Sequence, residues 1–357
     1  MIIGIDASNL NRGGGLTHLL ELISELDPKK HNFKKIIIWG NINTLKLIKN
    51  NSWIIKITPK ELESGLISRF FWQRFQLSKQ AKALKCDLLL IPGGSFSCSF
   101  RPIVTMSRNM LPFEWSEAKR YGFSQITLRL IILRLLQSRS FHSANGVIFL
   151  TNYAKEQVIR VTGSLPGKKS IINHGLNQRF LIKPNKQLEI SNYNFKKPFQ
   201  MLYVSIIDQY KHQWHVAEAV ARLRNNGYPV QLNLVGPAYP TSLKRLLNKI
   251  NKIDRKMEFI KYHGHIPYKD LHKIYQKSHL GIFASSCENM PNILIETMAA
   301  GLPIACSNRG PMPEVLGDSG LYFNPESVNE IYNALEMYIN NPKIRAEKAS
   351  ASFHDVQ

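Results

Sequence analysis

Two series of short apolar runs, each run followed by a segment long enough for a helix, constrain the fold of this chain most strongly. Parallel strands need long crossover connections, so this alternation is typical of a parallel sheet covered by helices. We therefore predict two doubly wound α/β domains. The predicted strands are 1–6, 34–39, 87–91, 103–106 and 146–150 in the first series, and 201–205, 231–235, 257–261, 280–284 and 303–306 in the second.

The length of 357 residues suffices for two domains that each bury a core. Residues 1–180 are predicted to form the N-terminal domain and residues 199–340 the C-terminal domain. Between them, residues 181–198 are polar and rich in Asn and Lys, which predicts a linker. Residues 341–357 are predicted to form a C-terminal helix.

The charge is strongly basic and unevenly distributed. The chain has a formal net charge of +22, and residues 1–180 carry +16 of it. Such a field attracts polyanions, which can be nucleic acid, anionic lipid or a phosphorylated acceptor. No apolar run approaches the roughly 18 residues that span a bilayer, and Asp6 interrupts the only start that resembles a signal peptide. We expect a cytoplasmic protein that begins at or near Met1.

Two segments of the basic half combine apolar side chains with arginines. They are residues 69–75, which contain three phenylalanines and a tryptophan, and residues 128–136, which are rich in Leu and Ile. Basic amphipathic helices of this kind lie on anionic membranes. Buried core helices whose arginines reach the solvent explain the same pattern. Both interpretations stand at this point.

The cysteines and aspartates do not predict a metal site. The four cysteines form no CxxC pair and have no histidines at zinc-finger spacing, so we interpret them as reduced, small hydrophobic residues. No two aspartates form a D-x-D unit of the kind that holds Mg²⁺ or Mn²⁺ against a diphosphate. We expect no bound metal and no cofactor.

The segment from Ser285 to Glu296 predicts a ligand site. It follows the apolar run 280–284, and Pro291 suits the first turn of a helix. Glu288 is therefore expected in the loop after a strand and Glu296 more than one turn into the helix. The helix start between them favours an anionic group. A sugar nucleotide offers a diphosphate there and hydroxyls for each carboxylate.

Together with residues 297–315, this segment resembles the signature of glycosyltransferase family 4, whose members are retaining sugar transferases of the GT-B fold. The resemblance implies two Rossmann-like domains facing across a cleft. It also implies that Glu288 holds donor-sugar hydroxyls and Glu296 holds the ribose. The residues implied to hold the diphosphate at the helix start are Asn289, Met290, Pro291, Asn292 and Ile293.

Residues 203–212 resemble another family segment, in which an arginine and a lysine neutralise the diphosphate. Lys211 matches the lysine, whereas Ile206 stands where the arginine usually is. Ser205 is implied to line the donor site. Arg12, beside a glycine run, is a candidate to replace the missing charge.

Gly13 to Gly15 follow the first predicted strand and open a helix expected over 16–26. The resemblance places Gly14 and Gly15 beside the donor diphosphate; a simple tight turn is the alternative. The spacing is not a dinucleotide fingerprint, because His18 occupies the third glycine position and no acid follows the second strand. This disfavours an NAD-dependent enzyme.

Asn109 follows the strand predicted at 103–106, where many family members carry a histidine that faces the donor sugar. Its amide or its backbone carbonyl is a candidate to act at the reacting carbon, and capping of a turn explains it equally well. His174 resembles part of the family's hinge motif and is expected to be structural. The resemblance also implies a final helix that crosses back onto the first domain, and the chain ends where that helix starts, so we expect it truncated.

The function implied is a retaining, metal-independent transfer of a sugar from a nucleoside diphosphate, UDP or GDP, to a glycan or lipid-linked acceptor in surface polysaccharide or lipopolysaccharide assembly. The enzyme is expected on the inner face of the cytoplasmic membrane. One alternative is a sugar-nucleotide epimerase or hydrolase of the same fold. A nucleic-acid-binding protein would explain the charge, but no RNP-like motif, helix-turn-helix or zinc site supports it. Nucleic acid is therefore not an expected partner.

Overall fold

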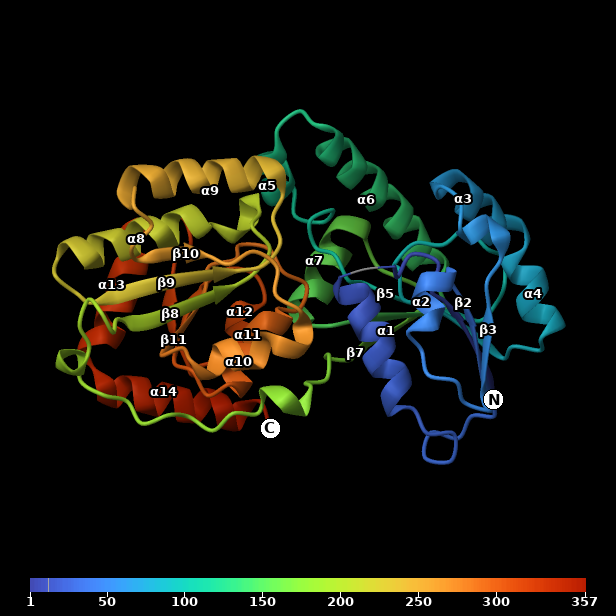
Figure 1. The fold of residues 1–357 in the computed structure, drawn as a ribbon. Helices are drawn as coiled ribbons and strands as arrows, with labels where there is room; N and C mark the ends of the chain where they lie inside the picture. The colour runs from blue at the N-terminus through green and yellow to red at the C-terminus, as the bar shows by residue number, and fades with distance from the viewer. Residues whose placement is uncertain (12) are drawn as a thin grey trace. The chain divides into compact units, whose positions relative to one another are not determined.

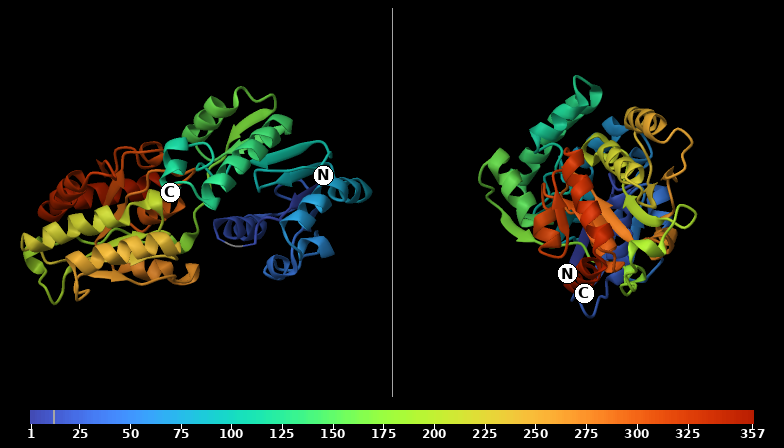
Figure 2. Two further views of the ribbon diagram at one scale, coloured as in Figure 1. Left: turned by 90° about the horizontal axis from the view of Figure 1, so that it is seen from above. Right: turned by 90° about the vertical axis from the view of Figure 1, so that its left-hand side faces the viewer.

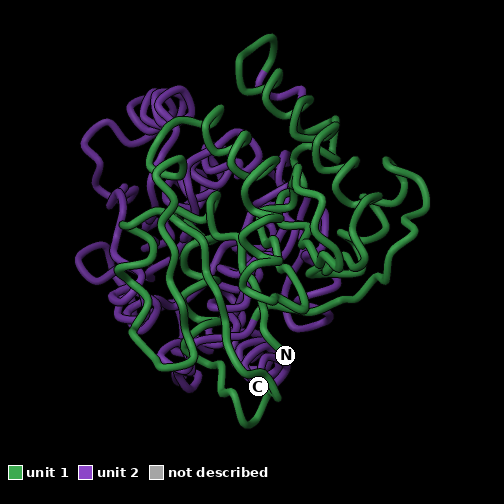
Figure 3. Tube along the Cα trace, turned by 90° about the vertical axis from the view of Figure 1, so that its right-hand side faces the viewer, with its two compact units in different colours: residues 1–118, 122–174 green, residues 119–121, 175–357 purple. Residues whose placement is uncertain are grey.

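The structure is a computed structural model that describes residues 1–11 and 13–357. The chain divides into two compact units, 1–118 with 122–174 and 119–121 with 175–357 (Figure 3). Arg12 lies outside the described residues. Residues 181–198, predicted as a linker, lie inside the second unit, because the backbone N–H of Ile182 donates to the carbonyl of Ala299 and Arg345 donates to Gln187.

Among the described residues, the first unit contains a seven-stranded parallel sheet of order β3-β2-β1-β4-β5-β6-β7 (Figure 1). Its strands are β1 (Ile2–Asp6), β2 (Lys35–Trp39), β3 (Ile54–Ile57), β4 (Leu88–Ile91), β5 (Ile103–Met106), β6 (Gly146–Phe149) and β7 (Lys168–Ile171). Its helices are α1 (Gly14–Glu25), α2 (Ile42–Lys46), η1 (Lys60–Leu62), α3 (Leu66–Phe75), α4 (Leu77–Ala83), α5 (Trp115–Ala118), α6 (Gln125–Ser143) and α7 (Asn152–Thr162).

Side chains of β2 alternate between two apolar layers of this unit. Ile36 and Ile38 pack with Leu19 and Ile23 of α1, whereas Ile37 and Trp39 pack on the other face with Trp72 of α3 and Leu77 of α4. A strand that is buried on both faces must be apolar at nearly every position, and every residue of the run Ile36–Trp39 is apolar and buried.

The second unit contains, within the described part of the chain, a six-stranded parallel sheet of order β10-β9-β8-β11-β12-β13. Its strands are β8 (Phe199–Val204), β9 (Val230–Val235), β10 (Ile260–Tyr262), β11 (Leu280–Phe283), β12 (Ile304–Ser307) and β13 (Leu321–Phe323). Its α-helices are α8 (Gln213–Asn225), α9 (Pro240–Ile253), α10 (Leu271–Gln276), α11 (Asn292–Ala299), α12 (Met312–Leu316), α13 (Val328–Asn340) and α14 (Pro342–Asp355). Its 3₁₀ helices are η2 (Lys119–Tyr121), η3 (Gln178–Phe180), η4 (Ile190–Asn192), η5 (Gln209–Lys211) and η6 (Tyr268–Asp270).

Helices cover both faces of this sheet. In Figure 1, α8 and α9 lie above its strands and α10, α11 and α14 below them. Figure 2 shows α8 and α9 side by side. Met201 and Tyr203 of β8 face one apolar layer, and Leu202 and Val204 face the other. The two predicted doubly wound α/β domains are therefore present.

The predicted strand positions need four corrections, all at sheet edges. The strands β3, β7 and β13 were not predicted, and the strand predicted at 257–261 is β10, Ile260–Tyr262. Met257 has φ 51°, a left-handed conformation that does not fit a strand. Edge strands are only partly buried, so their sequences carry a weaker apolar signal.

Other expectations hold with small shifts. The helix predicted at 16–26 spans 14–25, so Gly14 and Gly15 are its first residues and Gly13, with φ 65°, is its N-cap. The predicted C-terminal helix corresponds to α14. The four cysteines, Cys86, Cys98, Cys287 and Cys306, are buried and not disulfide-bonded. None of the described helices has the length and apolarity that a membrane span requires.

Candidate active site

The loops after β8 and β11 meet at one edge of the second sheet. These strands are neighbours in the sheet. The connection after β8 leads to β9 on one side of the pair, and the connection after β11 leads to β12 on the other side, so the two connections diverge from this point. Ligands of open α/β sheets bind at such a switch point, beyond the carboxyl ends of the strands. The backbone N–H of Ser286 donates to the carbonyl of Tyr210 at 2.8 Å, which fixes the two loops together.

Lys211 and Glu288 form an ion pair across these loops, with exposed side-chain fractions of 7% and 16%. Lys211 ends η5, and its carbonyl accepts a hydrogen bond from the Tyr203 hydroxyl at 2.8 Å. Its Nζ lies 4.8 Å from the centroid of the Tyr210 ring and 5.5 Å from that of Phe283. The ammonium therefore has two aromatic faces and one carboxylate around it, an environment that holds a cation where an anion can approach.

The loop after β11 ends where α11 begins. Pro291 is the N-cap of this helix, and its carbonyl accepts from the N–H groups of Leu294 and Ile295. The N–H of Asn292 donates to the carbonyl of Met290 at 3.0 Å. Residues 289–293 thus form the tight entry to α11, as predicted, and they begin one residue after Glu288.

Glu296 is the fifth residue of α11 and only 5% exposed. The hydroxyl of Tyr275 donates to its Oε2 at 3.5 Å, and Tyr268 also hydrogen-bonds to the carboxylate. Burial raises the pKa of Glu296 to about 7, against the lowering effect of these tyrosines. Arg179 lies 5.3 Å from the centroid of the Tyr268 ring and adds a weaker lowering effect.

Ser205 follows β8 and is buried. Its N–H donates to the carbonyl of Val235, and its carbonyl lies so near Gly236 that a Cβ there would be 2.1 Å from it. Gly236 has φ 144°, so this close approach of two loops needs glycine. Ser205 contributes to the shape of the loop, and its hydroxyl donates to the carbonyl of Ile206.

In the first unit, a basic cluster surrounds the start of α1. We define it as Arg108, His18 and His174, with Gly15 beside them. A Cβ on Gly15 would lie 3.0 Å from Nη1 of Arg108, and the rings of His18 and His174 are 4.5 Å apart. The buried Nε of Arg108 has no hydrogen-bond partner, and no ion pair engages Arg108 within residues 1–11 and 13–357.

Burial, reinforced by the Arg108 charge, lowers the pKa of His18 to about 4. For His174, burial, His18 and Arg108 together lower the pKa to about 3. Both rings are therefore neutral at pH 7, and Arg108 is the charged member of the cluster. Its pKa is also lowered by burial. A bound anion would relieve this unfavourable arrangement.

Asn109 follows Arg108, and its Oδ1 accepts from the N–H of Leu111 at 3.1 Å. This is the turn-capping role that the sequence left open beside a catalytic one. The described residues contain no group of three or more His, Cys, Asp or Glu placed to hold a metal ion.

Comparison with known proteins places the second unit in a family. Residues 185–353 match the family described as Glycosyl transferases group 1. This segment is a glycosyltransferase domain. The predicted relationship is thereby confirmed at the level of this group, and membership of family 4 remains a prediction. The match covers less than half of the 357 residues, so it assigns this family to the matched segment alone.

Two relatives and one solved structure show how far the likeness extends. The O-antigen chain mannosyltransferase B of Escherichia coli is 36% identical over 73 residues, which cover 20% of this chain and only 19% of that protein. An uncharacterized glycosyltransferase of Haemophilus influenzae is 21% identical over 98% of this chain and 94% of its own. Anabaena Alr3699/HepE, solved in complex with UDP, has a TM-score of 0.70 and 17% identity, covering 99% of this chain and 94% of that one. This likeness confirms the predicted GT-B fold.

The sequence did not single out several residues of the candidate site. Tyr268 and Tyr275 come from η6 and α10, and no motif marks them as partners of Glu296. His18 was noted only for its position in the sequence and Arg108 was not singled out, although an arginine two residues after β5 is a usable signal. Lys211, Glu288 and Glu296 lie in the second unit, whereas Gly14, Gly15 and Asn109 lie in the first.

Proposed function

We propose that the chain is a retaining, metal-independent glycosyltransferase that moves a sugar from UDP or GDP to a glycan or lipid-linked acceptor during surface polysaccharide or lipopolysaccharide assembly. The Lys211–Glu288 pair at the switch point of the second sheet is the observation that carries this proposal. The UDP bound to the structural neighbour and the O-antigen relative support the donor and the pathway class.

In this proposal the leaving diphosphate replaces Glu288 as the partner of Lys211. A leaving nucleoside diphosphate gains negative charge in the transition state, and a lysine held among aromatic rings stabilises it there. Glu288 is then released to accept hydrogen bonds from hydroxyls of the donor sugar. Glu296 accepts from the ribose, and the entry to α11 adds backbone N–H groups for the phosphates.

The reaction proposed is a front-face displacement. The bond between the anomeric carbon and the leaving phosphate oxygen breaks, and the acceptor oxygen bonds to the same face of that carbon. The acceptor's proton passes to the leaving phosphate oxygen. Neither Glu288 nor Glu296 forms a covalent bond to the sugar, and no metal ion takes part.

We also propose that the first unit contributes to phosphate binding through Gly14, Gly15 and Arg108. The start of α1 has no side-chain cap and no acid in its first turn, so it favours an anion. Arg108 lies against Gly15 and supplies the charge. Arg108 is therefore the proposed source of positive charge at the start of α1.

The test of the donor site compares Glu288→Gln with Glu296→Gln, with all assays in EDTA because the proposed mechanism uses no metal. Glu288→Gln removes the carboxylate that competes for Lys211, so bare UDP should bind at least as tightly, while transfer from an intact UDP-sugar falls about a hundredfold. Glu296→Gln should weaken bare UDP itself, about tenfold.

The matched control is Glu347→Gln, an exposed residue of α14, which should change neither quantity. Binding is measured by calorimetry with UDP and GDP. Equal nucleotide affinity in the two site variants would refute the division of roles, and loss of transfer in EDTA that Mg²⁺ restores would refute the metal-free mechanism.

Membrane association is a separate part of the proposal. Both helices that the sequence singled out expose apolar side chains: Leu66, Ile67, Phe70, Phe71 and Phe75 on α3, and Leu128, Ile131, Ile132, Leu135 and Leu136 on α6. Arg129 and Arg139 are exposed among the latter, and Arg134 is half-buried. A buried core helix would hide such residues, so the exposure favours docking on an anionic membrane.

Sedimentation with vesicles tests this docking. Changing Arg129, Arg134 and Arg139 to Gln should reduce binding to phosphatidylglycerol vesicles at low salt, by about 1 kcal/mol for each charge near the surface. Exposed Lys252, Arg255 and Lys256 of the second unit, changed to Gln, provide a control with the same charge loss. If the protein does not bind these vesicles but binds RNA tightly, the proposed membrane docking is wrong and nucleic acid becomes the proposed partner.

A further inference from the structure

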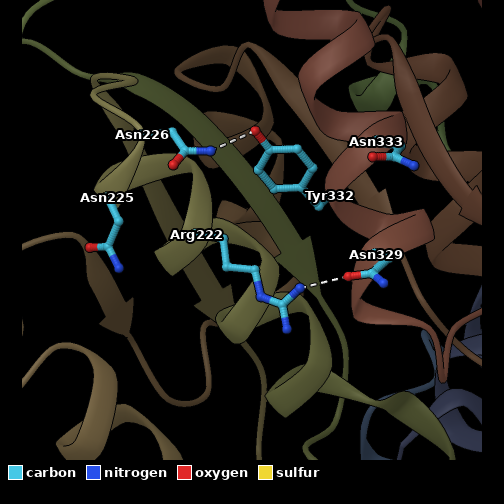
Figure 4. Close-up of a pocket in the computed structure, with 6 residues that line it drawn as sticks. All are labelled: Arg222, Asn225, Asn226, Asn329, Tyr332 and Asn333. Atoms are coloured by element: carbon cyan, nitrogen blue, oxygen red, sulfur yellow. Dashed lines mark hydrogen bonds between the residues drawn. The ribbon is translucent and has the colours of Figure 1, made fainter.

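The second unit has a polar groove between α8 and α13 that the proposed function does not use. Its volume is about 590 Å³, which lies within the range of small-ligand sites. The residues that line it are Arg222, Asn225, Asn226, Asn329, Tyr332 and Asn333 (Figure 4). Most of the chain between Lys211 and Arg222 lies in α8. Because an α-helix rises 1.5 Å per residue, the groove lies roughly 15 Å from the ion pair.

Half of the groove is fixed by internal hydrogen bonds. Arg222 donates through Nη1 to Asn329 at 2.6 Å and through Nη2 to Glu218 at 3.2 Å. The amide of Asn226 donates to the hydroxyl of Tyr332 at 2.9 Å (Figure 4), and that hydroxyl donates to Glu336. These contacts hold the tyrosine ring and the guanidinium in place before any ligand binds.

The other half carries polar groups that nothing engages. Within the described residues, the amides of Asn225 and Asn333 make no hydrogen bond, and both side chains are exposed. An amide offers two N–H donors and a carbonyl acceptor in one plane. Vicinal sugar hydroxyls both donate and accept, so two such amides beside a half-buried tyrosine ring match a carbohydrate. The ring supplies an apolar face for the C–H groups of a sugar.

The charge of the groove favours a neutral ligand over a phosphate. Its one cation, Arg222, already pairs with Glu218, and no carboxylate lines the groove. A protein partner fits poorly, because interface cores are rich in apolar and aromatic side chains and only Tyr332 is of that kind.

We propose that this groove binds a neutral oligosaccharide segment of the growing glycan, at a site separate from the donor site. The inference rests on the proposed function in one respect, that the acceptor or product is a glycan. A second point of attachment raises the effective concentration of the acceptor end near the enzyme. Long acceptors are then used better than short ones.

Affinity electrophoresis of the whole chain tests the groove without requiring transfer activity. The probes are mannan, dextran and glycogen, each dissolved in a native gel. The wild type should be retarded by at least one of them, and the double variant Asn225→Ala, Asn333→Ala should lose at least fivefold in apparent affinity. Alanine favours helix and neither amide has a partner, so the midpoint of thermal unfolding should not fall.

Asn248→Ala with Asn251→Ala, two exposed amides of α9, is the matched control and should be retarded like the wild type. Retardation by none of the three polysaccharides, or an equal loss in both double variants, would overturn the proposal. The affinity for UDP and for GDP, measured on the same samples, reports on the donor site. Glycan retention without binding of either UDP or GDP would refute the proposed donor but not the groove.

Discussion

Arg345 in the second unit is buried and Arg108 in the first is half-buried, and neither forms an ion pair in the described part of the chain. Their hydrogen bonding differs. Arg345 is fully buried and donates to the carbonyls of Leu188, Tyr338 and Ile339 and to the side chain of Gln187.

Arg108, in contrast, keeps a buried Nε without a partner and lies beside a glycine and two neutral histidines. A guanidinium whose N–H groups have hydrogen-bond partners holds chain segments together. A buried N–H group without a partner costs desolvation free energy that a ligand can recover. The comparison separates a structural arginine from one prepared for an anion.

The largest effect is expected at Arg345. Arg345→Met removes the donor from three backbone carbonyls, two of them in buried hydrogen bonds, so the free energy of unfolding should fall by about 3–5 kcal/mol. Urea unfolding measures it, with Lys343→Met on the exposed face of α14 as the control. A loss below about 1 kcal/mol would show that water replaces the guanidinium and that its hydrogen-bond network is not structural.

Glu296 is a buried carboxylate that accepts hydrogen bonds from the hydroxyls of Tyr268 and Tyr275. Its pKa in the folded protein, about 7, is above the ordinary 4.5, so the folded state binds the proton more tightly than the unfolded state. The associated stability is fully present below about pH 4.5 and is lost as pH rises through 7, in total about 3 kcal/mol.

Unfolding of the wild type and Glu296→Gln at pH 5, 6 and 8 measures this loss. Glutamine does not titrate, so the stability of the wild type relative to this variant should decrease over that range and then level off. A difference that is the same at the three pH values would mean that water reaches the carboxylate and that its pKa is ordinary.

The smallest effect is expected at Arg108. Arg108→Met should change the free energy of unfolding by less than about 1 kcal/mol, because the guanidinium makes no bond that the folded state loses. Affinity for UDP and for inorganic pyrophosphate should nevertheless fall about tenfold, or about 1.4 kcal/mol. Calorimetry measures both. If Arg108→Met destabilises the fold as much as Arg345→Met, the distinction between the two arginines fails.

The central strands could be predicted from the sequence because they are buried on both faces. Runs such as Ile36–Trp39 and Leu280–Phe283 are continuous and apolar for that reason. The edge strand Lys168–Ile171 has two exposed lysines at its start, so it lacks this pattern and was missed. Its pairing with β6 identifies it as a strand, and β6 lies too far away along the chain to be seen in a short stretch of sequence.

The candidate site shows the same limit. Glu288 and Lys211 could be predicted from local motifs, and the order of the strands then brings them together. The burial of Glu296 could not be predicted from the sequence, because Tyr268 and Tyr275, which contact it, come from elements more than twenty residues earlier. Likewise, contact between Arg108 and Gly15 depends on β5 and β1 lying on either side of β4 in one sheet.

The short helix η2, residues 119–121, belongs to the second unit although the chain on both sides of it belongs to the first. The hydroxyl of Tyr121 donates to Asp208 at 2.9 Å, and Arg120 pairs with Glu326 at 2.7 Å. The polypeptide therefore passes between the units three times, and a cut between residues 174 and 175 does not release a complete second unit. A fragment that starts at Gly175 lacks both contacts. A synthetic peptide carrying residues 115–125, added to that fragment, should restore part of its resistance to proteolysis.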